Sequence, residues 1–253
     1  MKAMILAAGL GTRLRPLTDD RPKALVEVAG HTLLAITLRR LREYGVRDAI
    51  VNVHHFGGLV VDYLKQNANF GMRVEISREE VLLDTGGGLK KAAWFFLDRP
   101  DEPFILHNVD VLSSIDLDRM LQVHRQNQSL ATLAVQDRET SRYLLFDAQN
   151  QLCGRRAGGG QEPEIVQPSK RIANKSGPIQ PLAFSGIHVI SPRLLTRMTE
   201  DGAFSIITSY LRLAGEGEKI AAFQADEYYW RDLGRPENVS QASSDVEQGV
   251  LRI

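Results

Sequence analysis

The 253-residue chain has little cysteine and no excess charge of either sign. Its single cysteine, Cys153, excludes an internal disulfide, fits a reducing compartment and is read as a small core residue. The 31 basic and 31 acidic side chains balance, so no basic field favours a nucleic acid or an anionic membrane as partner. No apolar run approaches the roughly 20 residues of a transmembrane helix, and the N-terminus does not resemble a signal peptide. We therefore expect a soluble, cytoplasmic protein that binds neither membranes nor nucleic acids.

Short apolar runs alternate with amphipathic stretches over the first half of the chain. Such alternation predicts a largely parallel sheet with helices on both faces. The expected strands are Lys2–Leu6, Ala49–Val53, Arg73–Ser77, Phe104–His107, Ala131–Val135, Leu144–Asp147, Phe184–Val189, Ile220–Gln224 and Tyr228–Trp230. The expected helices are Leu33–Tyr44, Gly58–Asn67, Gly88–Phe96 and Leu117–Gln126. We predict a Rossmann-like three-layer α/β/α sandwich with a mixed, mostly parallel sheet.

The most informative stretch is LAAGLGTRLRPLTDDRPKAL, residues 6–25. A short strand leads into small residues that let backbone N–H groups approach an anion, and Arg13 and Lys23 add positive charge. The loop lacks the G-x-x-x-x-G-K-[ST] of a P-loop, and Leu14 stands where a dinucleotide fingerprint has its third glycine. The stretch therefore predicts a phosphate-binding loop of another kind, at the carboxyl edge of the sheet.

Two later apolar runs end in carboxylates. PFILHNVDV, residues 103–111, contains Asn108 and Asp110, and YYWRDLGRPEN, residues 228–238, contains Asp232. Two carboxylates at separate strand ends can hold one hard cation, typically Mg²⁺, together with phosphate oxygens and water. Aspartate after a strand is also common in turns, so neither run alone predicts a metal site.

A fourth stretch, LLDTGGGLKKAA, spans residues 82–93. Three glycines that open a helix allow close backbone approach and leave unpaired N–H groups at the positive end of the helix. The alternative interpretation is a glycine-rich helix start without a ligand.

Together, the four stretches resemble the motifs of the sugar-nucleotide pyrophosphorylases, which are nucleoside-triphosphate:sugar-1-phosphate nucleotidyltransferases. The first resembles G-x-G-[ST]-R…P-K, and the carboxylate runs resemble the metal-binding N-x-D and W-x-D-[IL]-G-x-P-E. LDTGGG, FSGI and GAFSI are most similar to short bacterial N-acetylmuramate-1-phosphate uridylyltransferases. The resemblance implies a Mg²⁺-dependent reaction in which a sugar 1-phosphate attacks the α-phosphorus of a nucleoside triphosphate and pyrophosphate leaves.

The resemblance also implies roles for individual residues. Arg13, Lys23 and Asp110 would be catalytic, and Asp110 and Asp232 would hold the metal. The residues expected to bind the nucleotide are Leu6, Ala7, Ala8, Gly9, Gly11, Thr12, Arg13, Lys23, Glu79, Thr85 and Gly86. The residues expected to bind the sugar phosphate are Asn108, Tyr143, Gly154 and Gly186.

The chain departs from the family pattern on the sugar side. Val109 replaces the usual glycine between Asn108 and Asp110, and Leu144 follows a tyrosine where relatives often have glycine. Gln167 stands where the lysine of an E-K-P stretch would meet the sugar phosphate. We therefore expect an acceptor other than the 1-phosphates of glucose or mannose, namely that of an amino sugar or a related hexose, with UTP as the favoured donor.

Three alternatives stay open at this point. The chain could be a mannose- or heptose-1-phosphate guanylyltransferase, or a nucleotide-sugar sensor or regulatory subunit without turnover. The third, a Rossmann-type dehydrogenase, is disfavoured by Leu14 and by the lack of a fitting acidic residue at the end of strand Ala49–Val53.

The chain length suits a single catalytic domain. We expect residues 1–113 to bind mainly the nucleotide and residues 114–253 mainly the sugar phosphate. No hexapeptide repeat is visible, so no C-terminal repeat domain is expected, and a homo-oligomer is left open. Residues 154–181 are rich in Gly, Pro, Gln and charge, which predicts a long surface loop.

Overall fold

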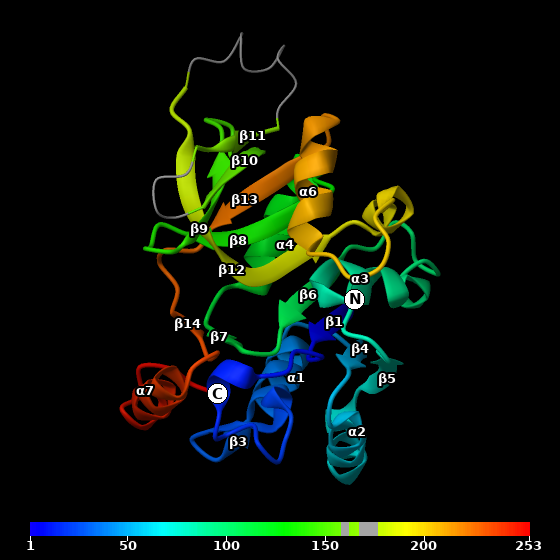
Figure 1. The fold of residues 1–253 in the computed structure, drawn as a ribbon, viewed down its shortest axis with the longest axis vertical. Coiled ribbons are helices and arrows are strands. Elements are labelled where there is room, and N and C mark those ends of the chain that lie inside the picture. The colour runs from blue at the N-terminus through cyan, green and yellow to red at the C-terminus, as the bar shows by residue number, and fades with distance from the viewer. Residues whose placement is uncertain (158–161, 167–176) are drawn as a thin grey trace.

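The computed structural model describes residues 1–157, 162–166 and 177–253. Within these ranges a ten-stranded sheet has the order β11-β10-β9-β12-β6-β1-β4-β5, with β8 paired to β12 and β13 paired to β8 (Figure 1). Its strands are β1 (Lys2–Leu6), β4 (Asp48–Val53), β5 (Arg73–Arg78), β6 (Phe104–Asn108), β8 (Ala131–Gln136), β9 (Arg142–Phe146), β10 (Leu152–Ala157), β11 (Glu164–Ile165), β12 (Gln180–Ile190) and β13 (Ile220–Gln224). Two small antiparallel pairs join β2 (Glu27–Val28) to β3 (His31–Thr32) and β7 (Val111–Ser113) to β14 (Trp230–Asp232).

The first part of the sheet is parallel. Strands β6, β1, β4 and β5 run in one direction, whereas β12 runs antiparallel to β6, β8 and β9. In register, Leu6 at the end of β1 lies between Asn52 of β4 and Asn108 of β6. The carboxyl ends of three strands therefore meet at one edge, which is where open α/β sheets bind ligands.

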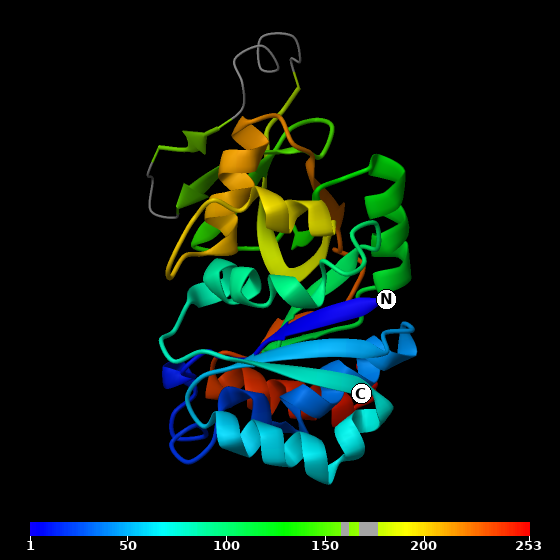
Figure 2. The same cartoon turned by 90° about the vertical axis from the view of Figure 1, so that its right-hand side faces the viewer.

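Helices cover both faces of the sheet. They are α1 (Leu33–Glu43), α2 (Gly57–Gln66), α3 (Asp84–Lys91), α4 (Leu117–Asn127), α6 (Ile206–Gly215) and α7 (Pro236–Glu247). Ala3 and Ile5 of β1 join a core with α1, α2, α4 and α7, and Met4 and Leu6 join a second core with α3 and α6. This alternation is the period of two that a strand buried on both faces requires. Figure 2 shows the resulting layers, with α2 and α7 below the first strands and α3 above them.

The predicted fold class is confirmed, and most predicted strands agree with the structure to within two residues. Capping side chains fix several helix starts: Thr32 accepts from the Ala35 N–H of α1 at 3.1 Å, and Asp116 accepts from the Arg119 N–H of α4 at 2.9 Å. No helix in the described ranges is long and apolar enough to cross a membrane.

Two predicted elements need correction, and one helix was not predicted. The last strand is Trp230–Asp232 rather than Tyr228–Trp230, because the chain still turns at Tyr228, whose N–H donates to the Ala225 carbonyl at 3.1 Å. The helix expected at 88–96 begins at Asp84, ends at Lys91 and is followed by a 3-10 turn. Helix α6 lies in a stretch for which no helix was predicted.

The predicted surface loop at 154–181 is wrong at both ends. Strand β10 continues to Ala157, β11 pairs with it, and β12 begins at Gln180. A Cβ at Gly154 would stand 2.3 Å from the Glu164 carbonyl oxygen, so a glycine is needed for β11 to approach β10. The remainder of the predicted loop, residues 158–161 and 167–176, lies outside the described residues.

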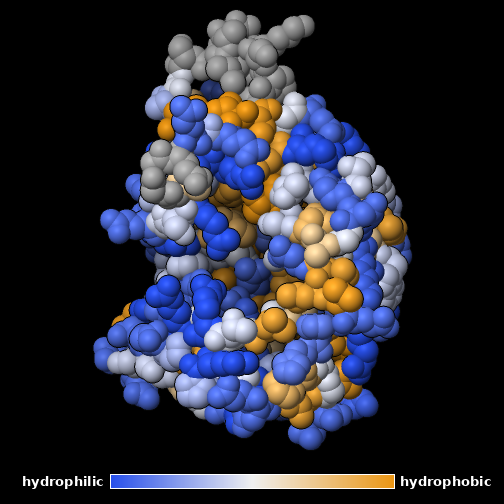
Figure 3. All heavy atoms as spheres, in the orientation of Figure 1, coloured by the Kyte–Doolittle hydropathy of each residue, from blue (hydrophilic) through white to orange (hydrophobic). Residues whose placement is uncertain are grey.

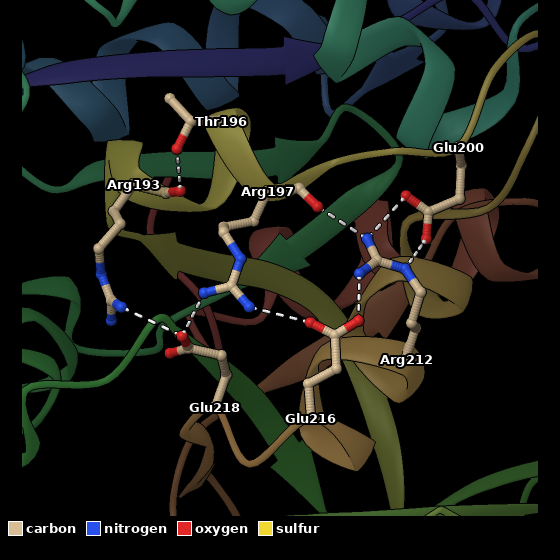
Figure 4. Close-up of polar contacts among 7 residues, drawn as sticks. All are labelled: Arg193, Thr196, Arg197, Glu200, Arg212, Glu216 and Glu218. Atoms are coloured by element: carbon tan, nitrogen blue, oxygen red, sulfur yellow. Dashed lines mark hydrogen bonds and ion pairs between the residues drawn. The ribbon is translucent and has the colours of Figure 1, made fainter.

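The segment between β12 and α6 is held by a chain of ion pairs (Figure 4). Arg197 donates to Glu218 at 2.7 Å and to Glu216 at 2.9 Å. Arg212 donates to Glu216 at 2.7 Å and to Glu200 at 2.9 Å. Single exposed pairs contribute about 0–1 kcal/mol, but a linked network fixes geometry. The network anchors the start of the loop at residues 200–205, which packs on α3.

Candidate active site

A cavity of about 370 Å³ opens at the carboxyl edge of β1, β4 and β6. It is lined by Leu6, Ala8, Gly9, Lys23, Asn52, Glu79, Leu82, Asp84, Thr85, Asn108, Asp110 and Ala203. Most of these residues were predicted from the sequence; Asn52, Leu82, Asp84 and Ala203 were not. On the face drawn in Figure 3, the surface is hollowed between the upper and lower parts of the molecule.

The predicted phosphate loop brings a lysine to an aspartate at this edge. Lys23 Nζ lies 2.7 Å from Asp110 Oδ2, and the two side chains are only 15% and 13% exposed. Gly11 has φ 66°, and the Thr18 hydroxyl donates to its carbonyl oxygen at 2.8 Å. A Cβ at Gly11 would stand 2.9 Å from Thr18 Cγ2, and one at Gly9 would stand 3.5 Å from Lys23 Nζ. The loop therefore needs glycine at 11 to close over Thr18 and hold a cation in the cavity.

The second predicted carboxylate, Asp232, belongs to a segment that is hydrogen-bonded to the backbone at Asp110. Strand β14 pairs with β7, and the Leu233 N–H donates to the Asp110 carbonyl oxygen at 2.8 Å. Asp232 Oδ1 accepts from the Gly234 N–H at 2.7 Å. A Cβ at Gly234 would meet Asp232 Oδ1 at 2.8 Å and an Arg13 guanidinium nitrogen at 2.9 Å. Arg13, Lys23, Asp110 and Asp232 are thus brought together from separate parts of the chain.

Asp110 and Asp232 are better suited to share a hard divalent cation with a ligand than to form a metal site made of protein side chains alone. The described residues contain no cluster of three or more His, Cys, Asp or Glu side chains able to hold a metal. A structural zinc site needs four such ligands and a catalytic one needs three. Mg²⁺ is commonly held by one or two carboxylates, with phosphate oxygens and water completing the shell. Asp110 and Asp232 suit that second arrangement when a phosphorylated ligand is bound.

On the opposite side of the cavity, a buried polar network joins two loops. Asn52 Oδ1 accepts from the Ala7 N–H at 2.7 Å, and Asn52 Nδ2 donates to Glu79 Oε1 at 2.7 Å. Glu79 Oε2 accepts from the Leu83 N–H at 2.9 Å. Asn52 and Glu79 are 2% and 5% exposed, so water cannot reach them and these hydrogen bonds supply the partners that water would otherwise provide. Asn52 was not predicted; its one sequence signal is its place near the end of β4.

The three glycines of residues 86–88 are explained by packing. The N–H groups of Gly86 and Gly87 donate to the Phe204 carbonyl oxygen at 2.9 and 3.3 Å, so the expectation that they are unpaired is wrong. A Cβ at Gly86 would lie 2.3 Å from the Phe204 ring. Thr85 Oγ1 accepts from the Ile206 N–H at 3.0 Å and so ties α3 to the start of α6. Thr85 still lines the cavity.

The predicted sugar-side residues divide into two groups. Gly186, with φ 76°, lies where the pairing of β12 is irregular, and a Cβ there would stand 2.9 Å from Asn108 Nδ2. Gly186 therefore brings the β12 backbone against Asn108 at the cavity. Tyr143 of β9 and Gly154 of β10 take part in the pairing of these two strands and do not line the cavity.

Three histidines are buried: His107, His124 and His188. Burial lowers the pKa of His107 and of His124 to about 4 and that of His188 to about 3. His107 donates from Nδ1 to the Asn108 carbonyl oxygen at 2.8 Å and so fixes the end of β6. Burial also raises the pKa of Cys153 to about 11, which fits the predicted core role of this thiol.

Fold and site together define an α/β nucleotide-binding protein with two carboxylates and two cations at one sheet edge. The chain belongs to the nucleotidyl transferase family, whose model matches residues 2–158. It is 36% identical over 240 residues to an N-acetylmuramate alpha-1-phosphate uridylyltransferase of Caulobacter vibrioides, covering 93% of this chain and 92% of that protein.

More distant relatives include a probable mannose-1-phosphate guanylyltransferase of Oryza sativa. It is 27% identical over 93% of this chain, which spans 62% of the length of the rice protein. A putative glucose-1-phosphate thymidylyltransferase of Bacillus anthracis, solved with a sucrose, superposes with a TM-score of 0.77 at 17% identity, covering 96% of this chain and 94% of that one. This likeness supports the assignment of the fold.

Proposed function

We propose that the protein transfers a uridylyl group from UTP to a sugar 1-phosphate and releases pyrophosphate. The observation that best supports this proposal is that Arg13, Lys23, Asp110 and Asp232 come together at one edge of the sheet. Phosphoryl transfer of this kind needs positioning and charge neutralisation rather than a covalent nucleophile, and the cluster supplies both.

Each residue of the cluster has a role in this proposal. Lys23 neutralises the α-phosphate region, and Arg13 neutralises charge on the departing pyrophosphate. Asp110 and Asp232 would hold Mg²⁺, which when bound withdraws electron density from the phosphate oxygens. Backbone N–H groups of residues 8–12 surround the phosphates.

The remaining predicted residues complete the proposal. Glu79, Thr85 and Gly86, with Leu6, Ala7, Ala8, Gly9, Gly11 and Thr12, form the nucleotide side. Asn108, Tyr143, Gly154 and Gly186 form the sugar side, although only Asn108 of these lines the cavity. Residues 1–113 thus contribute mainly to nucleotide binding and residues 114–253 mainly to sugar-phosphate binding, in a protein that we place in the cytoplasm.

The test is pyrophosphate release from a matrix of nucleoside triphosphates and sugar 1-phosphates with Mg²⁺. We expect UTP to exceed GTP and dTTP, and an amino-sugar 1-phosphate to exceed glucose 1-phosphate. A preference for GTP would instead favour the guanylyltransferase that the rice relative exemplifies. Thermal shifts rank the bases independently, because a ligand at a hundred times its Kd stabilises by about 2.7 kcal/mol. Triphosphate binding without any pyrophosphate release would favour a sensor.

A further inference from the structure

An arginine that was not singled out from the sequence, Arg138, follows β8 by two residues and is half-buried. Its guanidinium carbon stands 3.7 Å from the centre of the Trp230 ring, and its Nη2 donates to the Phe184 carbonyl oxygen at 2.9 Å. Trp230 Nε1 in turn donates to the Ser185 carbonyl oxygen at 2.8 Å. The two side chains therefore hold the backbone immediately before Gly186, which packs against the cavity residue Asn108.

Arg138 makes no direct ion pair with an acidic side chain among the described residues. None of the ion pairs between described residues includes Arg138, and its buried Nε has no hydrogen-bond partner among those residues. The ranges 158–161 and 167–176 contain no aspartate or glutamate. A partly buried cation without a directly paired carboxylate costs stability, and this cost falls when an anion binds beside it.

The surroundings of Arg138 indicate where such an anion binds. Burial lowers the pKa of Arg138, while the nearby Asp232 and Tyr143 act in the opposite direction. Arginine stays protonated at any ordinary pH despite this shift. Arg138 stacks on Trp230, which precedes Asp232 by two residues in β14, and it holds the β12 backbone that leads to Gly186 and Asn108.

We propose that Arg138 binds the phosphate group of the sugar 1-phosphate. This inference rests on the function proposed above. Lys23 is already paired with Asp110, so a second cation on the sugar side can neutralise the charge of the acceptor phosphate. A guanidinium stacked on an indole presents its planar donors in a fixed direction, which suits a phosphate.

The test compares Arg138→Gln and Arg138→Lys with a matched control, Arg125→Gln, which changes an exposed arginine in the last turn of α4. In Arg138→Gln, the KM for the sugar 1-phosphate should rise by roughly tenfold or more, because a charge-assisted hydrogen bond is lost. The KM for the nucleoside triphosphate should stay within about twofold in the same variant. Arg138→Lys should fall between wild type and Arg138→Gln, since an ammonium keeps the charge without the planar donors.

A binding measurement separates this role from a structural one. The chain has two tryptophans, so in a Trp94→Phe background the emission of Trp230 reports on the residue that Arg138 covers. Titration with the sugar 1-phosphate should give a saturable change, whose midpoint rises roughly tenfold in Arg138→Gln.

The outcomes are distinguishable. An unchanged KM and midpoint in Arg138→Gln, with normal turnover of the wild type, would overturn this inference and leave the proposed function standing. An equal rise in both KM values together with a lower Tm would show that Arg138 only supports the fold. If Arg138→Gln does not fold, a wild-type KM in Arg138→Lys overturns the inference, whereas a raised KM with a wild-type Tm supports it. No pyrophosphate release by the wild type with any substrate pair would instead overturn the proposed function.

Discussion

The two walls of the cavity differ in how far apart along the chain their residues lie. The phosphate wall consists of residues 6–25 with Asp110, and a single short loop supplies most of its contacts. The residues proposed for the sugar side, here called the sugar wall, are Asn108, Arg138, Gly186 and Trp230. They come from four separate segments, and of these four only Asn108 lines the cavity. A loop that carries its own glycines and cations keeps its geometry with little help from elsewhere. The sugar wall depends on strand pairing and on buried groups, so the two walls should respond differently to mutation and to pH.

The largest effect is expected where both walls meet, at Asp110 and Asp232. Asp110→Asn or Asp232→Asn should lower kcat by at least about a hundredfold, because each removes one of two carboxylates proposed for Mg²⁺. The measurement is steady-state pyrophosphate release over a range of Mg²⁺ concentrations. Asp62→Asn, on the exposed face of α2, is the matched control and should behave as wild type. Near-normal activity of either site variant at ordinary Mg²⁺ would contradict the metal assignment.

A smaller catalytic loss is expected within the phosphate wall. Lys23→Ala should lower kcat/KM by roughly tenfold to a hundredfold, because it removes the cation that lies against Asp110. Lys23→Arg should keep only part of the activity, since a planar guanidinium places its charge and donors differently from a compact ammonium beside Asp110. Lys65→Ala, an exposed lysine of α2, serves as control. The role of Lys23 is wrong if Lys23→Ala keeps most of its kcat/KM.

Acid should destabilise the protein through three buried histidines, His107, His124 and His188. Burial holds their pKa values at about 4, 4 and 3, below the ordinary value of 6.5. Above pH 6.5 the three histidines are mostly neutral in both the folded and the unfolded chain, so they do not lower the free energy of unfolding. Below pH 6.5 the unfolded chain binds protons that the folded chain does not. The free energy of unfolding should therefore fall by about 1 kcal/mol per histidine between pH 6.5 and 5.5.

Urea unfolding at several pH values measures this loss, and proton NMR titration of the folded protein assigns it. The three buried rings should stay neutral at pH 5.5. A stability that is flat between pH 6.5 and 5.5 would contradict the assignment of these histidines as buried and neutral.

The smallest effect concerns the loop that packs on α3. Gly86→Ala should lower the free energy of unfolding by about 1–3 kcal/mol, because its Cβ would stand 2.3 Å from the Phe204 ring. Gly58→Ala in α2 is the matched control: its Cβ meets nothing within 4 Å, so alanine should be neutral or stabilise by up to about 1 kcal/mol. Urea unfolding of both variants at pH 7.5 checks the contrast. Equal stability of the two would show that the triplet is not needed for packing.

The sequence by itself determined the fold class, most strands of the sheet, the phosphate loop and both carboxylates. These features depend on hydrophobic periodicity and on residue types at short spacing, which a linear chain displays directly. The family follows from the same motifs.

Tertiary structure decided what lies between the motifs. Asn52 and Arg138 carry no motif of their own, because their partners, Glu79 and Trp230, are distant in the sequence. The glycines at 86–88 looked like an open anion site, yet Gly86 and Gly87 allow the approach of residues 202–204, and Gly88 makes room for Glu79 and Asn52. The ends of the predicted loop became strands because β10 and β12 pair with segments that local sequence does not reveal. Strand pairing and close packing depend on which segments meet in space, and that information is not contained in any short stretch of the chain.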